Sequence, residues 1–234
     1  MNFKYCISHS MNKQKLLLEV FGKVLFAVVG LMVLLFVPKG SFLYWQAWLY
    51  CLVLFIPTIT LFIYLFFSNP ESLERRLKTK EKDADQKLIS MLSSLMFLIA
   101  FFVPGFDSKF GWSSVSVGVI IVAVIIFLLG YGLYAWVVLT NAYAASVIEV
   151  EKDQRIVTNG PYASVRHPMY LAVVMTYGAS PVILGSYWAL IALLPLPLLI
   201  VMRITREERM LLSTFPAYKE YCEKTPYRLI PFLW

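Results

Sequence analysis

Long apolar runs separated by short polar connections dominate the hydropathy pattern of this 234-residue chain. The runs, each about 16 to 25 residues long, match a membrane-crossing helix or one arm of a helical hairpin. Backbone groups in lipid must bond to one another, so helices are expected, and unbroken apolar stretches lack the alternation of barrel strands. The pattern therefore predicts an all-α, polytopic integral membrane protein. The six runs cover 20–37, 44–67, 88–103, 115–139, 169–184 and 187–202.

The fifth and sixth runs differ from the first four. They are short and are joined by a turn that contains Gly185, which favours a tight helical hairpin over about 169–202. Pro195 and Pro197 remove backbone donors from the second arm, so this arm should kink or open a cavity. We therefore expect an N-terminal scaffold over 1–139 and a C-terminal functional region over 140–234.

Composition supports the membrane assignment. The chain is 59% hydrophobic, its mean hydropathy is +0.70, and only 15% of its residues are charged. Soluble domains carry about 25% charged residues. These values exclude an ordinary soluble globular protein.

Positive charge is distributed asymmetrically among the connections. All but two of the 21 Lys and Arg residues fall in the N-terminal segment, the second and fourth connections or the tail; the exceptions are Lys39 and Lys109. Cytoplasmic loops retain Lys and Arg, so both termini are predicted to be cytoplasmic. The net charge of +7 then reflects topology and contact with anionic lipid rather than nucleic-acid binding.

Several common cofactor and metal motifs are missing from the sequence. The only histidines are His9 and His167, and the three cysteines form no C-x-x-C pair, so no metal centre is expected. The segment G-Y-G-L-Y-A, from Gly130 to Ala135, imitates a dinucleotide fingerprint but lacks the strand-helix context of a Rossmann fold. Its small residues are better explained by close helix packing.

Two polar clusters lie where apolar runs end. The first is N-G-P-Y-A-S-V-R-H-P-M-Y, from Asn159 to Tyr170, and the second is R-I-T-R-E-E, from Arg203 to Glu208. Positions i, i+3 and i+4 share a helix face, so Arg203, Arg206 and Glu207 should converge while Glu208 turns aside. Interfacial ion pairs and an aromatic belt would explain the same residues without chemistry.

Together with the G-S-Y-W turn, F-P-A-Y-K-E-Y-C and a terminal Y-R-L-I-P, these clusters resemble the isoprenylcysteine carboxyl methyltransferase family. More broadly they are similar to membrane methyltransferases that include phospholipid N-methyltransferases. The resemblance is specific over 147–231 and only architectural before it. It implies an S-adenosylmethionine (SAM) site without a Rossmann fold, formed by a cytosolic loop and tail.

Carried onto this chain, the resemblance implies cofactor contacts and catalytic roles for named residues. Arg203 would bind the acceptor substrate, and Arg203 and Glu207 would form the catalytic pair. A guanidinium can hold a carboxylate with two hydrogen bonds, and a carboxylate can pair with the ammonium of the cofactor. The implied cofactor-binding residues are Gln154, Arg155, Ile156, Val157, Tyr162, His167, Pro168, Met169, Tyr170 and Glu207.

The resemblance implies methyl transfer to a lipophilic acceptor that enters from the bilayer. On this resemblance, carboxyl O-methylation of an isoprenylcysteine-like acceptor is the first expectation, and its carboxylate would need no general base. A lipid amine would have to lose a proton, with Glu208 or Tyr170 as candidate relays. The other readings are an NADPH-dependent sterol-type reductase and a non-enzymatic membrane protein. The expected location is the plasma membrane in a bacterium or the endoplasmic reticulum in a eukaryote.

Overall fold

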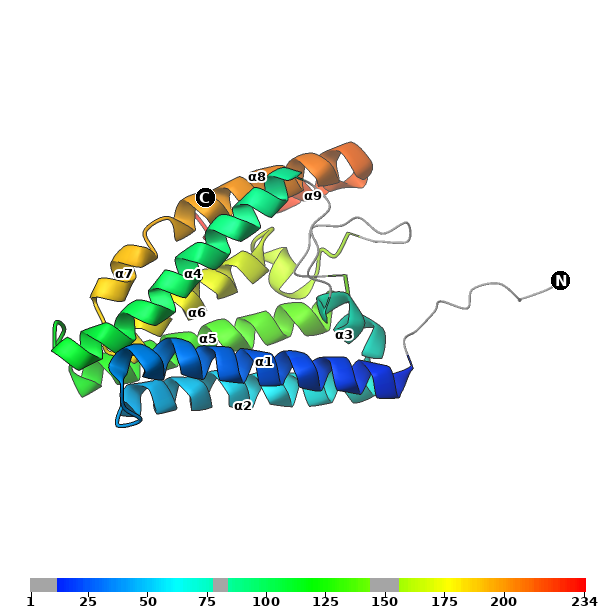
Figure 1. The fold of residues 1–234 in the computed structure, drawn as a ribbon. Coiled ribbons are helices and arrows are strands. Elements are labelled where there is room, and N and C mark those ends of the chain that lie inside the picture. Colours follow the sequence, from blue (N-terminus) through cyan, green and yellow to red (C-terminus); the bar gives the residue numbers. More distant parts are fainter. Residues whose placement is uncertain (1–11, 78–83, 144–155) are drawn as a thin grey trace.

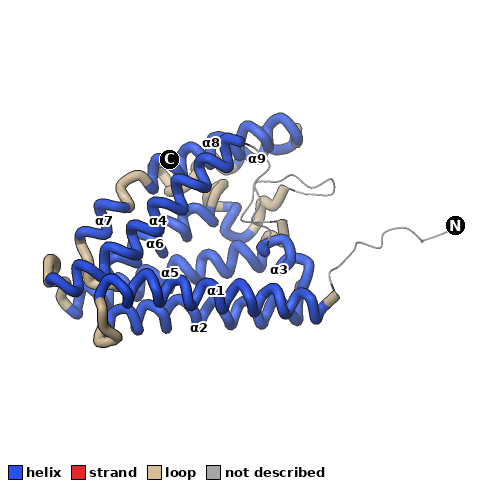
Figure 2. Tube along the Cα trace, viewed as in Figure 1, coloured by secondary structure: helices blue, strands red, loops and turns tan. Residues whose placement is uncertain are grey.

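The computed structural model describes residues 12–77, 84–143 and 156–234. Figure 2 shows helices joined by short loops, and the described residues contain no strand. The prediction of an all-α polytopic membrane protein is confirmed. The elements, in chain order, are α1 (Lys13–Lys39), α2 (Trp45–Ser68), α3 (Pro70–Leu77), α4 (Ala84–Phe110), α5 (Val117–Thr140), the 3-10 turn η1 (Gly160–Ala163), α6 (Pro168–Ile183), α7 (Trp188–Ala192), α8 (Leu196–Thr214) and α9 (Ala217–Lys224).

Five stretches within the described ranges are long and apolar enough to cross a membrane. Four of them correspond to α1, α2, α4 and α5, and the fifth runs through α7 and α8 over Trp188–Thr214. Helix α6 is shorter, and its 16 residues rise about 24 Å, less than a hydrocarbon core of about 30 Å. The paired arms predicted over 169–202 are therefore present as α6 followed by α7 and α8.

Two helices extend beyond the apolar runs from which they were predicted, and each contains a proline. The first run was expected to end at 37, but α1 continues through Pro38 to Lys39. The third was expected to end at 103, but α4 continues through Pro104 to Phe110. The Pro104 carbonyl accepts a hydrogen bond from the Tyr44 hydroxyl at 3.3 Å, so a neighbouring side chain bonds to the backbone there. In the last arm the prediction of a break is confirmed, because α7 ends at Ala192 and α8 begins only after Pro195.

The helices pack around three apolar clusters. One joins α1, α2, α5 and α6, a second joins α4, α6, α7, α8 and the tail, and a third joins α1, α2, α3 and α5. Figure 1 shows α1, α2 and α5 side by side, with α4, α7 and α8 crossing above them. Helix α6 packs along α5 and connects the two groups.

The connections lie at opposite ends of the bundle (Figure 1). At one end, Asp107 accepts hydrogen bonds from the Ser113 hydroxyl at 2.6 Å and the Ser186 hydroxyl at 2.5 Å, which ties the α4–α5 and α6–α7 turns together. At the other end lie α3, η1, α9 and most of the described Lys and Arg residues, whereas Lys39 and Lys109 lie beside the turns. The charged end is thus separated from the other as the sequence predicted, and its cytoplasmic orientation remains a prediction.

Helices α5 and α6 approach most closely at Gly130. A Cβ atom added there would lie 2.7 Å from Met175 Cβ and 3.1 Å from Thr176 Cγ2, whereas one added at Gly132 would meet nothing within 4 Å. Close packing through a small residue is therefore confirmed at Gly130 and not at Gly132. The packed site positions α6, the helix that directly follows His167.

We expect Gly130→Ala to lower the free energy of unfolding by about 1–3 kcal/mol, because the added methyl forces α5 and α6 apart. Thermal unfolding of the detergent-solubilised protein measures this. Gly132→Ala is the matched control and should be neutral or slightly stabilising, because alanine favours the helix. Equal stability of the two variants would contradict close packing at Gly130.

Candidate functional site

The loop that ends at His167 is fixed by its own sequence and by the C-terminal tail. Gly160 adopts φ +60°, a conformation that glycine takes without strain, and starts the 3-10 turn η1. His167 precedes Pro168, which keeps it out of the helical conformation, and α6 begins with this proline. The backbone amides of Arg166 and His167 donate to the carbonyls of Tyr227 and Arg228, each at 2.9 Å. The tail therefore holds the histidine loop in place.

His167 lies between two consecutive glutamates of α8. Its Nε2 atom is 3.2 Å from Glu208 Oε1, and its Nδ1 atom is 3.8 Å from Glu207 Oε2. The imidazole is buried, with only 4% of its side chain exposed, whereas the Glu207 side chain is 28% exposed. One ring nitrogen of the histidine thus lies beside a buried acid and the other beside an accessible acid.

Glu208 is the buried acid. Its Oε2 atom accepts a hydrogen bond from Arg228 Nε at 2.8 Å, and its Oε1 atom forms an ion pair with Arg166 Nε at 3.1 Å. The Arg166 contact is an ion pair without the alignment of a hydrogen bond. Glu208 was expected to point to a different helix face from Glu207, and that face lies in the protein interior. Buried carboxylates need such partners to offset their lost hydration.

Arg203 lies one turn before Glu207 and contacts two other helices. Its Nη1 atom donates to Ser90 Oγ of α4 at 3.2 Å, and its Nε atom donates to the Tyr170 hydroxyl of α6 at 3.4 Å. Tyr170 is itself buried and interacts electrostatically with Glu207. Arg203, Tyr170 and Glu207 therefore form a connected group beside His167.

Tyr162 lies in a neighbouring network. Its hydroxyl accepts from Asn141 Nδ2 at 3.0 Å, and its carbonyl accepts from the Tyr221 hydroxyl at 2.7 Å. Burial raises the pKa of Tyr162 to about 12, so its phenol is neutral at physiological pH. Glu207 contributes to this shift in pKa, which places Tyr162 within electrostatic range of the site.

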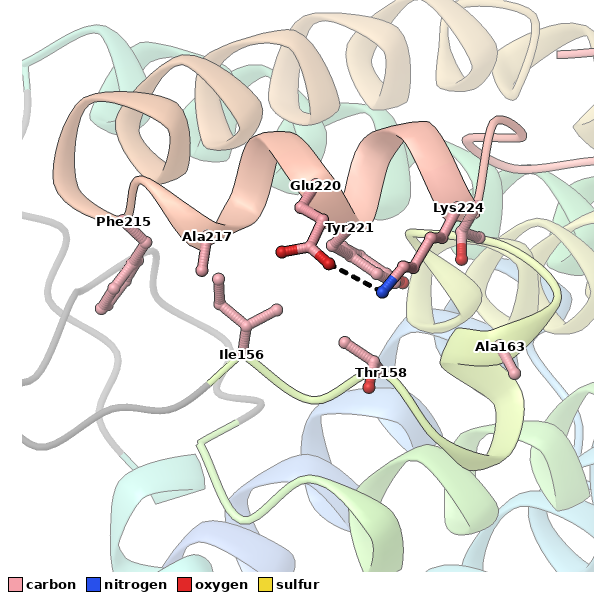
Figure 3. A pocket seen from close by; sticks show the side chains of 9 residues that line it. Ile156, Thr158, Ala163, Phe215, Ala217, Glu220, Tyr221 and Lys224 are labelled. Atoms are coloured by element: carbon pink, nitrogen blue, oxygen red, sulfur yellow. Dashed lines mark hydrogen bonds and ion pairs between the residues drawn. The ribbon is translucent and has the colours of Figure 1, made fainter.

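A pocket of about 640 Å³ opens between residues 156–158 and α9 (Figure 3). Ile156 and Thr158 line one side, while Phe215, Ala217 and Tyr221 line the other, where Glu220 and Lys224 form an ion pair of 2.8 Å. Among the predicted cofactor residues that the structure describes, only Ile156 lines this pocket. Val157 follows it in the same segment, and Gln154 and Arg155 lie outside the described residues.

One buried polar atom near the glutamates has no partner among the described residues. The Tyr218 hydroxyl is buried and forms no hydrogen bond there, although Glu208 and Glu207 act on it electrostatically. Burial and these two carboxylates raise its pKa, so it stays protonated and can donate. A hydroxyl of this kind fits a site that receives a polar ligand.

Residues 119–217 match the phospholipid methyltransferase (PEMT) family. The matched region runs from α5 through α8 and includes His167, Arg203 and Glu207. It thus contains both polar clusters singled out in the sequence. The tail that carries Arg228 lies beyond it.

The chain is also similar to a solved structure, that of the eukaryotic intramembrane Ras methyltransferase ICMT (isoprenylcysteine carboxyl methyltransferase). The superposition covers 92% of this chain and 86% of that chain, with 19% sequence identity and a TM-score of 0.47. No curated protein matched the chain.

The structure brings together some of the predicted residues in the matched region and adds others. His167, Tyr170, Arg203 and Glu207 converge, and Pro168 and Met169 form the first turn of α6 beside them. Sequence reasoning missed four contributors, which are Ser90, Arg166, Tyr218 and Arg228. Arg166 and Arg228 stand inside the quoted motifs and could have been considered as partners for the adjacent acids, whereas nothing marked Ser90. No group of three His, Cys, Asp or Glu residues suited to a metal occurs in the described part of the chain.

Proposed function

We propose that the protein is an integral membrane methyltransferase that uses SAM. The observation that carries the proposal is the convergence of His167, Glu207 and Arg203 inside the region that matches the phospholipid methyltransferase family. A carboxylate, an imidazole, a guanidinium and the protonated Tyr218 hydroxyl form a mixed set of donors and acceptors. This set suits the ammonium and carboxylate of an amino-acid cofactor.

In this proposal the residues hold the cofactor, orient the acceptor and exclude water. Glu207 pairs with the ammonium of the cofactor, and the segment that contains Ile156, Val157 and Tyr162 encloses its nucleoside. SAM supplies a methyl group on a sulfonium, and transfer breaks the S–CH3 bond as a bond to the acceptor forms. Arg203 orients the acceptor. Positioning of this kind can lower a barrier by about 7–11 kcal/mol when the reacting atoms are aligned.

A carboxyl acceptor of the isoprenylcysteine type is the leading substrate. Arg203 supports it, because a guanidinium binds a carboxylate well and a carboxylate attacks without losing a proton. The acceptor would enter from the bilayer, which the exposed apolar faces of the long helices contact.

Lipid amine methylation is the second candidate, and the phospholipid methyltransferase match favours it. An amine must lose a proton after transfer. Both oxygens of Glu208 are engaged by His167, Arg166 and Arg228, so Glu208 is a poor relay and Tyr170 is the better candidate.

Titration of the detergent-solubilised protein with SAM tests the proposal. We expect a dissociation constant on the order of micromolar, within the usual range for enzyme ligands. Incubation with labelled SAM and membrane extract should give a labelled lipid-soluble product. Release of the label by mild base identifies an ester, and retention identifies an N-methyl group. Binding of NADPH in place of SAM, or of neither, would contradict the proposal and favour a reductase or a non-enzymatic protein.

A further inference from the structure

Glu208 is held by three cationic or hydrogen-bond-donating groups at once. Arg228 Nε donates to one oxygen at 2.8 Å, while Arg166 Nε and His167 Nε2 approach the other at 3.1 and 3.2 Å. Only 8% of the Glu208 side chain is exposed, so water screens these contacts little. Two permanently charged guanidinium groups keep the carboxylate ionised. Glu208 therefore accepts hydrogen bonds and cannot donate one.

An ionised Glu208 decides which nitrogen of a neutral His167 carries the proton. The nitrogen beside an acceptor must be the donor, so the proton belongs on Nε2 and Nδ1 keeps its lone pair. The distance on the other side agrees with this assignment. Nδ1 lies 3.8 Å from Glu207 Oε2, too far for a direct hydrogen bond, as expected for two acceptors that share no proton.

We infer that Glu208 is a positioning residue that fixes the Nε2–H tautomer of His167, so that Nδ1 and Glu207 together present two acceptors to one cationic N–H donor. The proposed function identifies that donor as the ammonium of SAM, and only this identification rests on it. Glu208 acts through His167 and Arg166 rather than by touching the ligand. A ring with a proton on Nδ1 would turn an N–H group toward the ligand ammonium and repel it.

The C-terminal tail completes the positioning group. Its backbone accepts from Arg166 and His167, and its Arg228 side chain bonds to Glu208. The tail then folds back, with the Trp234 carbonyl accepting from the Leu229 and Ile230 amides at 2.9 and 3.1 Å. The Trp234 ring lies 5.5 Å from the Arg228 guanidinium, a cation–π distance that restrains this side chain. The histidine is thus fixed by residues outside the matched family region.

The first arm of the test reads the tautomer without any ligand. The full chain carries only His9 and His167, so ring-labelled histidine in the His9→Gln protein gives the signals of one imidazole. Nitrogen NMR in detergent at about pH 9, where a free imidazole is neutral, shows which nitrogen is protonated. We expect a proton on Nε2 and none on Nδ1. A proton on Nδ1, alone or together with Nε2, would overturn the inference even if SAM binds.

The second arm changes the positioning residue. Glu208→Gln keeps the shape but lets an amide N–H compete with the arginines for the same place, so we expect a mixture of tautomers. SAM affinity should fall about tenfold or more, a loss of the size seen when a residue that orients a metal-binding histidine is changed. Glu223→Gln, an exposed site on α9, is the matched control and should change neither quantity. Unchanged tautomer and affinity in a folded Glu208→Gln protein would overturn the inference.

A second variant covers the case in which Glu208→Gln does not fold. Arg228→Lys keeps the positive charge but loses the 2.8 Å bond from Nε. It should shift the nitrogen signals of His167 in the same direction, by a smaller amount. A folded Arg228→Lys protein with the wild-type spectrum would count against the role of the tail. A wild-type Nε2–H spectrum without SAM binding would support the tautomer and contradict the proposed function, so the two failures are distinct.

Discussion

Glu207→Gln is expected to weaken SAM binding by about 10- to 100-fold, because hydrogen bonds to charged groups contribute about 1.5–3 kcal/mol. Glutamine occupies the same volume, but it replaces one acceptor oxygen with a donor and removes the negative charge. Of the two glutamates beside His167, Glu207 is the one that a ligand can reach, and its Oε2 atom lies 3.8 Å from His167 Nδ1. Isothermal titration of the detergent-solubilised protein with SAM measures the change.

The control for this variant separates binding from folding. Glu223→Gln removes a negative charge from an exposed site on α9 and should leave SAM affinity within about twofold, because exposed charges interact weakly through water. The Glu207 side chain is 28% exposed, against 8% for Glu208, so the melting temperature of Glu207→Gln should stay close to that of the wild type. Unchanged SAM affinity in the folded variant would remove Glu207 from the cofactor site.

The helices could be predicted from the sequence more accurately than their ends. Runs of apolar residues identify spans because lipid imposes one simple requirement on the backbone. The apolar runs over 20–37 and 88–103 stop just before Pro38 and Pro104, yet both prolines lie inside helices. A proline within a run of apolar residues does not by itself mark the end of a helix, because the packing of the whole bundle decides whether the helix continues.

The site was predicted as a set of residues and not as an arrangement. Spacing placed Glu207 on the face of Arg203 and turned Glu208 aside, which is correct for an isolated helix. Spacing cannot say which face becomes buried, and the buried face here is defined by Arg166 and the tail residue Arg228. Glu208, the more buried of the two glutamates, was therefore predicted only as a candidate proton relay, whereas Glu207 was predicted to be catalytic.

The contacts of Arg203 could not be predicted from spacing along the sequence either. Its partner Ser90 belongs to α4, 113 residues earlier, in a helix interpreted as scaffold. A single serine within an apolar run carries no pattern that would mark it. The division into a scaffold over 1–139 and a functional region over 140–234 stays a prediction, and this contact shows that α4 supports the functional end.

Arg203→Ala is expected to lower the rate of methyl transfer by about 100- to 1000-fold while SAM affinity stays within about twofold. Truncating one member of a buried charged pair typically costs about 2–5 kcal/mol, and misplacing a reactant by about 1 Å costs about 100-fold. Arg203 contacts Tyr170 and Ser90, and in the proposed function it faces the acceptor rather than the cofactor. Single-turnover transfer with saturating SAM, measured beside SAM titration, separates the two effects.

Two further variants show what Arg203 supplies. Arg203→Lys keeps the charge without the planar fork, so a carboxylate acceptor should still lose at least about tenfold in transfer rate. Ser90→Ala removes only the 3.2 Å bond to Nη1 and should cost a few-fold, since one neutral hydrogen bond contributes about 1 kcal/mol. This ranking follows from a guanidinium held by α4 and α6 and directed at an anionic acceptor. Equal losses of SAM affinity and transfer in Arg203→Ala would instead assign Arg203 to the cofactor, and the acceptor carboxylate would then need another partner.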